Sequence, residues 1–189
     1  MFLLCFVFCQ FLLAQTTHKT FKTSVQFKYE YQYALHKPQG DAKKPLLIFL
    51  HGSGEKGTDV ELVKVHGPFK YLKTHELDAY VLAPQCPKEV YWESESLYQL
   101  IQEVIKQNKN IDTNRIYLTG LSMGAWGAWN LAFAHPEMFA ALVPIAGFVD
   151  RGLSSDSARS VLENMCSSIR SRVPDDESTW FSEELRVGF

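Results

Sequence analysis

Gly120-Leu121-Ser122-Met123-Gly124 follows an apolar run, Ile116-Tyr117-Leu118, and precedes a stretch of helical composition, residues 125–134. A serine between two glycines at a strand-to-helix junction is the pattern of a nucleophile elbow, a tight turn that projects the serine hydroxyl. The glycines remove the Cβ atoms that would collide with the strand and the helix. The sequence therefore predicts that Ser122 is a catalytic nucleophile; the alternative is a plain glycine turn.

Acyl transfer also needs N–H donors aimed at the oxygen that becomes negative. The backbone N–H of Met123, at the start of the following helix, is the expected first donor, and the helix dipole supports it. We expect the second donor in the loop after the apolar run 46–50, and we assign it to the backbone N–H of Ser53. The motif glycines that would let the backbone approach a ligand are Gly52, Gly54, Gly120 and Gly124.

Short, nearly continuous apolar runs alternate with helical patterns along the chain. The runs cover residues 46–50, 80–83, 116–118 and 140–146. Such runs suit strands that are buried on both faces, and the alternation predicts α/β architecture: a mainly parallel sheet with helices on both faces. Residues 26–35 alternate polar and apolar, which predicts a half-buried strand near a sheet edge. One predicted helix carries its apolar stripe over residues 97–105, and Ser96 with Gln99 would form its capping box.

Four phrases carry a family resemblance: Phe49–Gly57, His66–Pro68, Ala83–Pro87 and Asn110–Gly124. With them, the stretch from about Pro45 to Gly147 resembles secreted esterases of the dienelactone-hydrolase and phospholipase/carboxylesterase branch of the α/β-hydrolases. The resemblance implies an α/β-hydrolase fold. It also implies cleavage of carboxylic esters without a cofactor, often of short acyl groups or of acyl groups on saccharides.

The same resemblance implies a triad acid and a later histidine, but no histidine follows His135. Triad acid and base are therefore left unassigned. We expect His51 to orient the oxyanion loop, and His135 to interact with the end of its helix. We also expect the fold to be truncated at its C-terminal end and this chain to be inactive. The alternatives are a non-catalytic remnant or ligand-binding module, and a histidine supplied by a partner chain.

The predicted organisation has three parts. Residues 2–14 are apolar except for Gln10, which predicts a signal peptide over residues 1–15 and a secreted or periplasmic protein; the alternative is a buried strand. Residues 16–150 would form the partial hydrolase domain. Residues 151–189 are rich in arginine and serine and are expected to be a poorly ordered tail.

The composition is that of a globular domain, with 46% apolar and 21% charged residues. A formal net charge of −2 gives no reason to expect nucleic acid or a membrane surface as partner, so a small-molecule or saccharide ester is favoured. No cysteine or histidine spacing resembles a metal site, and no cofactor is implied. A disulfide between Cys86 and Cys166 stays open.

Aromatic residues offer candidates for the walls of a binding site. Trp92 follows the strand predicted at 80–83, and loops at the carboxyl ends of parallel strands line sites in open α/β sheets. We therefore take Trp92 as the candidate pocket residue. Trp126 and Trp129 share a face of the helix after Ser122, and we expect them to pack in the core.

Overall fold

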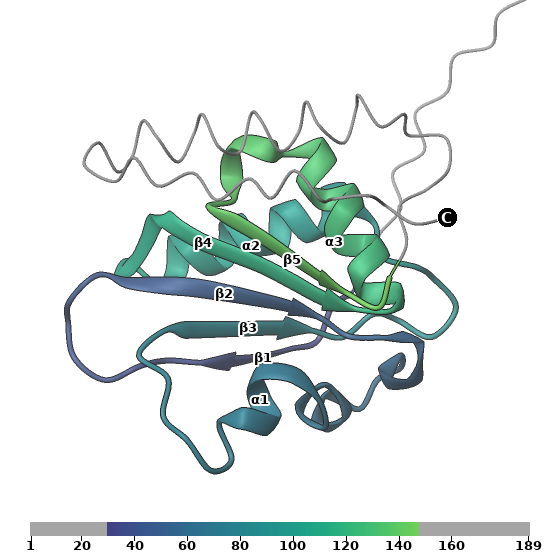
Figure 1. Cartoon of the computed structure of the whole chain (residues 1–189), viewed down its shortest axis with the longest axis horizontal. Coiled ribbons are helices and arrows are strands. Elements are labelled where there is room, and N and C mark those ends of the chain that lie inside the picture. The colour runs from purple at the N-terminus through teal and green to yellow at the C-terminus, as the bar shows by residue number, and fades with distance from the viewer. Residues whose placement is uncertain (1–29, 148–189) are drawn as a thin grey trace, which may run out of the picture.

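The computed structural model describes residues 30–147, which form one five-stranded sheet with helices on both faces (Figure 1). The strands are β1 (Tyr33–His36), β2 (Lys44–Leu50), β3 (Tyr80–Pro84), β4 (Ile111–Leu121) and β5 (Ala141–Ile145). They lie in the order β1-β3-β2-β4-β5, and only β1 runs antiparallel to its neighbour. The predicted mainly parallel sheet is confirmed, and the four apolar runs lie in β2 to β5.

Two strands differ from their predicted extents. The edge strand β1 begins at Tyr33, so residues 30–32 are not strand, and residues 26–29 lie outside the described part. In contrast, β4 is far longer than the predicted 116–118, because it already pairs with β2 at Ile111. Its polar residues 112–115 are not buried and gave no apolar signal.

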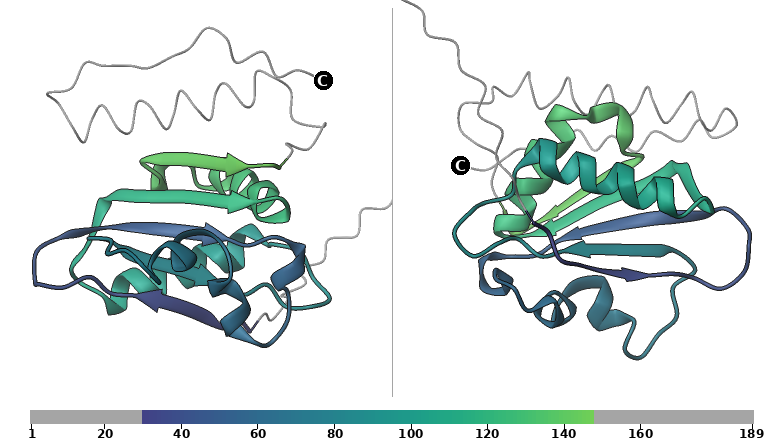
Figure 2. Two further views of the ribbon diagram at one scale, coloured as in Figure 1. Left: turned by 60° about the horizontal axis from the view of Figure 1, so that its bottom comes forward. Right: turned by 180° about the vertical axis from the view of Figure 1, so that it is seen from behind.

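The helices divide between the two faces of the sheet. On one face lie α2 (Ser94–Gln107) and α3 (Met123–Ala134), and on the other lie the short 3₁₀ helix η2 (Val60–Lys64) and α1 (Gly67–Tyr71), as Figure 2 shows. Successive residues of β2 point to opposite faces of the sheet. Ile48 packs in the apolar cluster under α2 and α3, and Phe49 packs with η2 and α1. Helices on both faces are thereby confirmed.

The apolar stripe of α2 packs in and against the core as predicted, but the start of the helix differs from the prediction. The helix begins at Ser94, and Glu93 caps it by accepting hydrogen bonds from the backbone N–H of Glu95 and of Ser96. The capping box of Ser96 with Gln99 is therefore wrong. Glu93 precedes the first turn and meets the free N–H groups there, whereas Ser96 already lies within the helix.

Helix α3 is apolar on nearly all sides, because it packs at the same time against β4, β5, β2 and α2. Two further 3₁₀ helices are η1 (Ser53–Glu55), directly after β2, and η3 (Pro136–Met138), after α3. Within residues 30–147, no helix is long and apolar enough to cross a membrane. The predicted signal peptide and the predicted tail from residue 151 lie outside the described residues.

Candidate active site

Ser122 lies between the last residue of β4 and the first residue of α3 and has a positive φ of 55°. Non-glycine residues rarely adopt this region, which costs energy and tends to occur at functional sites. Two sets of hydrogen bonds hold the turn: the Ser122 N–H donates to Ile145 O at 2.9 Å, and the Ser122 carbonyl accepts from Ala125 N and Trp126 N. The Ser122 side chain is exposed at the carboxyl end of the parallel strands.

Glycine is required on both sides of Ser122 for steric reasons. A Cβ atom on Gly120 would overlap the Gly124 backbone, and one on Gly124 would overlap the Leu50 backbone. Helix α3 therefore starts in direct contact with the ends of β2 and β4. The tight strand–turn–helix junction that the sequence pattern predicts is the geometry observed around Ser122.

The loop after β2 lies against this turn. A Cβ atom on Gly52 would be 3.5 Å from Leu121 O and 3.8 Å from Ser122 Cβ, so Gly52 brings the loop up to the serine. Ser53 is the first residue of η1, as Met123 is of α3. The first N–H of a helix has no acceptor within that helix. Gly54 is different, because a Cβ atom there would meet nothing within 4 Å.

His51 links the loop after β2 to the loop after β3 by hydrogen bonds. Its Nε2 accepts the Cys86 N–H at 2.9 Å, so Nδ1 carries the proton and donates to Gly52 O at 2.6 Å. The side chain is 1% exposed, and burial lowers the pKa of His51, although the Gly52 hydrogen bond and the Glu55 charge oppose this shift. A neutral ring with both nitrogens engaged orients the loop and has no free nitrogen to serve as a base.

The remaining described histidines are His36, His66, His75 and His135. His66 is half-exposed and lies 3.4 Å from the Glu55 carboxylate, and His135 stacks on Tyr98 with its Nε2 3.5 Å from Glu95. His75 stacks on Tyr71. No described histidine forms a hydrogen bond, ion pair or ring contact with Ser122. Within residues 30–147, no group of three or more potential ligands is arranged to hold a metal ion.

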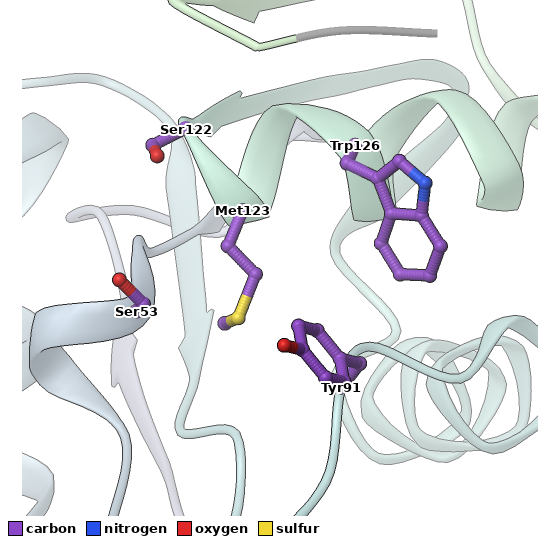
Figure 3. A pocket seen from close by; sticks show the side chains of 5 residues that line it. All are labelled: Ser53, Tyr91, Ser122, Met123 and Trp126. Atoms are coloured by element: carbon purple, nitrogen blue, oxygen red, sulfur yellow. The ribbon is translucent and has the colours of Figure 1, made fainter. Parts of the chain in front are cut away.

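A pocket of about 520 Å³ lies beside Ser122, within the size range of small-molecule sites. Its lining residues are Ser53, Tyr91, Ser122, Met123 and Trp126. Figure 3 shows the two serine hydroxyls on one side, the Tyr91 and Trp126 rings on the other, and the Met123 side chain between them. The pocket therefore has a polar end at the serines and an aromatic end.

The tryptophans near the pocket differ in part from the places that the sequence predicted for them. Trp92, the candidate pocket residue, is 3% exposed and donates its indole N–H to His51 O at 3.2 Å. It packs against Gly127, where a Cβ atom would be 2.6 Å from the Trp92 side chain. Its neighbour Tyr91 lines the pocket instead. Trp126 packs against the core as expected, but it also lines the pocket. The loop carries no periodicity that tells which of Tyr91 and Trp92 points inward.

The Cys86 thiol is free and buried beneath the same loops. It donates to Val90 O at 3.5 Å, and burial raises the pKa of Cys86 to about 11. The thiol is therefore protonated at neutral pH and is not a nucleophile. Cys166 lies outside the described residues.

Solved structures share this architecture. A thermostable esterase is 28% identical with a TM-score of 0.50, and the match covers 74% of this chain and 48% of that one. An acetyl xylan esterase from Aspergillus awamori is 20% identical with a TM-score of 0.53, over 63% of this chain and 47% of that one. Together with the sheet order and the turn at Ser122, these likenesses define an α/β-hydrolase fold.

The sequence comparisons specify the family. The Esterase family, described as "Putative esterase", matches residues 66–180, more than half of the chain, and the chain belongs to this family. Poly(3-hydroxyalkanoate) depolymerase C from Paucimonas lemoignei is 32% identical over an alignment of 130 residues, and the match covers 59% of this chain and 30% of that protein. The chain thus spans about a third to a half of the length of these relatives.

Proposed function

We propose that the protein is a serine-dependent carboxylic ester hydrolase that works through an acyl-enzyme on Ser122. One observation carries this proposal: Ser122 has a strained φ of 55° at the strand-to-helix turn and opens into a pocket that also contains Ser53. Strain of this kind is costly and persists only where the surroundings enforce it. Membership of the Esterase family supports ester cleavage as the reaction.

In the proposed reaction, Ser122 Oγ forms a bond to the ester carbonyl carbon, and its proton goes to the alcohol that leaves. Water then cleaves the acyl-enzyme, which returns the serine and releases the acid. The carbonyl oxygen carries the negative charge in both steps. The backbone N–H groups of Ser53 and Met123 would stabilise it, because both are first amides of helices and the α3 dipole favours an anion there.

For the substrate, we propose short acyl esters or acylated saccharides, handled without a cofactor outside the cytoplasm. The pocket is open and of small-molecule size, and its lining combines apolar surface with the hydroxyls of Ser53, Tyr91 and Ser122. The similar proteins include a poly(3-hydroxyalkanoate) depolymerase and a thermostable esterase. The secreted or periplasmic location rests on the apolar segment at residues 2–14.

A second candidate function is an ester-binding module without turnover. It is favoured by the finding that no described histidine contacts Ser122 and that both nitrogens of the buried His51 are engaged. Loss of a triad histidine costs about a millionfold in turnover, while an oxyanion hole and binding retain roughly 10³-fold over water. For this chain we therefore expect slow hydrolysis at most.

Hydrolysis of p-nitrophenyl acetate by the purified chain tests both candidates. The comparison is with Ser122→Ala and with Thr58→Ala, which removes an exposed hydroxyl away from the pocket. Turnover that disappears in Ser122→Ala and remains in Thr58→Ala supports the hydrolase and contradicts the binding module. Equal residual rates in all three support the binding module. Mass spectrometry after fluorophosphonate treatment reports separately whether Ser122 is reactive.

A further inference from the structure

The aromatic end of the pocket is built by two rings from different elements. Tyr91 comes from the loop between β3 and α2, and Trp126 comes from α3. Their ring centroids lie 6.1 Å apart with an interplanar angle of 74°, an edge-to-face contact. This arrangement is within the range that stabilises aromatic pairs. Each ring therefore limits the orientations of the other.

Tyr91 is 66% exposed even though it is part of this pair. The Lys56 ammonium lies 4.9 Å from its ring centroid, a cation–π contact that adds a second restraint. Core packing does not require Tyr91, because the adjacent Trp92 fills the buried position against Gly127. The loop thus holds an exposed aromatic surface in a defined place beside the pocket.

The lining also has a definite order along the pocket. Figure 3 shows Ser122 and Ser53 at one end, the flexible thioether of Met123 in the middle, and the rings of Tyr91 and Trp126 beyond it. An ester carbonyl at Ser122 would extend one of its two arms across Met123 to the rings. A planar aromatic group on that arm would cover exposed aromatic surface and contact a polarisable sulfur.

We propose that this site selects esters that carry an aryl ring on a short linker, with Tyr91 as the specificity-determining residue. The inference rests on the proposed function in one respect, since it places the ester carbonyl at Ser122. Arylalkanoate esters and arylalkyl acetates share the required chemistry. They differ only in whether the ring lies on the acyl or the alcohol side.

The test measures binding by ligand-observed NMR titration of the full chain carrying Ser122→Ala, so that turnover does not interfere. Methyl 3-phenylpropanoate is compared with methyl 3-cyclohexylpropanoate, and 2-phenylethyl acetate with 2-cyclohexylethyl acetate. We expect the aryl member of at least one pair to bind about fivefold more tightly than its saturated counterpart. The pair that shows the preference identifies the side of the ester that reaches the rings.

Substitutions at two tyrosines assign this preference. Tyr91→Leu is expected to abolish it and Tyr91→Phe to retain it. Tyr71→Leu is the matched control, because Tyr71 is also an exposed tyrosine in contact with another ring but does not line the pocket. Equal binding within both pairs, or a preference that survives Tyr91→Leu, would overturn the inference. A preference for aryl esters in a chain that does not hydrolyse them would contradict the proposed function alone.

Discussion

Gly124 lies where the first turn of α3 crosses the end of β2, and the two backbones leave no room for a side chain. Gly54, in the loop beside the pocket, has open space around it. The two glycines therefore allow a comparison between a position where a side chain would overlap backbone atoms and a position where it would not. Both belong to the motifs that the sequence singled out, yet only one is fixed by contact in the folded chain.

We expect Gly124→Ala to lower the free energy of unfolding by about 3 kcal/mol or more, because the new methyl group can fit only if backbone moves. Gly54→Ala should change it by less than about 0.5 kcal/mol. Urea denaturation followed by circular dichroism measures both variants. Similar losses in the two variants would show that the contact between α3 and β2 is not the cause.

The neutral His51 ring predicts a pH dependence of stability. Because burial lowers the pKa of His51 from the usual 6.5, the unfolded chain takes up a proton below pH 6.5 that the folded chain does not. The stability linked to His51 is fully present above pH 6.5 and is lost as the pH falls toward the lower, folded-state pKa.

Urea unfolding of the parent chain and of His51→Gln at pH 5.5, 6.5 and 7.5 measures this contribution. We expect the parent to gain stability from pH 5.5 to 7.5 more steeply than the variant. His51→Gln should also be less stable at pH 7.5, since it disturbs the hydrogen bonds to Cys86 N and Gly52 O. Parallel pH profiles would mean that His51 does not hold this lowered pKa.

Helix α2 depends on a glutamate cap at its start. Burial alone would raise the pKa of Glu93, but the hydrogen bonds from Ser96 and Glu95 outweigh it and lower that pKa from its usual value of 4.5. The stability linked to this carboxylate is therefore present above pH 4.5 and is lost as the pH falls through the folded-state value.

Glu93→Ala should cost about 1 kcal/mol of unfolding free energy at pH 7, the typical effect of losing a cap. The difference from the parent should shrink below pH 4.5. Glu95→Ala is the control, because Glu95 lies in the same first turn but is exposed and does not cap the helix. Equal losses for Glu93→Ala and Glu95→Ala would indicate a general charge effect at the helix start.

Elements with a strong apolar pattern could be predicted from the sequence, and their boundaries could not. The runs in β2, β3 and β5 were recognisable because those strands are short and apolar. By contrast, the ends of β4 and β1 depend on backbone pairing, which the side chains do not encode. The cap of α2 is a glutamate, which is less typical at that position than serine or aspartate.

Part of the candidate site could likewise be predicted from the sequence, and part of it could not. The positions of Ser122, Ser53 and the motif glycines follow from local turn chemistry, which acts between neighbours in sequence. The places of Tyr91, Trp92 and Trp126 follow from packing between distant segments. Gly127 was the one sequence signal for the buried place of Trp92. A glycine within a helix can mark where a large side chain from another segment packs, as Trp92 does here.

Strand β5 is the last strand in the order of the described sheet. Its alternate residues face opposite ways. Leu142 packs against the α2–α3 cluster, whereas Val143 and Ile145 are 57% and 48% exposed. An exposed apolar strand at a sheet edge favours association between chains.

The double variant Val143→Thr with Ile145→Thr should therefore reduce aggregation, measured by light scattering, and change the free energy of unfolding by less than about 1 kcal/mol in total. Leu142→Thr is the control on the opposite face. It should destabilise the chain by about 1 kcal/mol or more, because it places a hydroxyl among packed apolar groups. Unchanged light scattering in the double variant would show that this face does not drive association.

The pairing of β2 with β4 also fixes where the residues of the candidate site lie relative to each other. Leu50 is aligned with Gly120 in this pairing. Gly52 and Ser122 are each two residues beyond this aligned pair, and Ser53 follows Gly52 directly. The number of residues between the last aligned pair and the site is thus part of the geometry of the candidate site. Relatives should vary in length at residues 37–43 and 72–78, because these connections are mostly exposed. An added or missing residue at 50–53 or 120–124 would displace Ser53 or Ser122 while the sheet itself stayed intact.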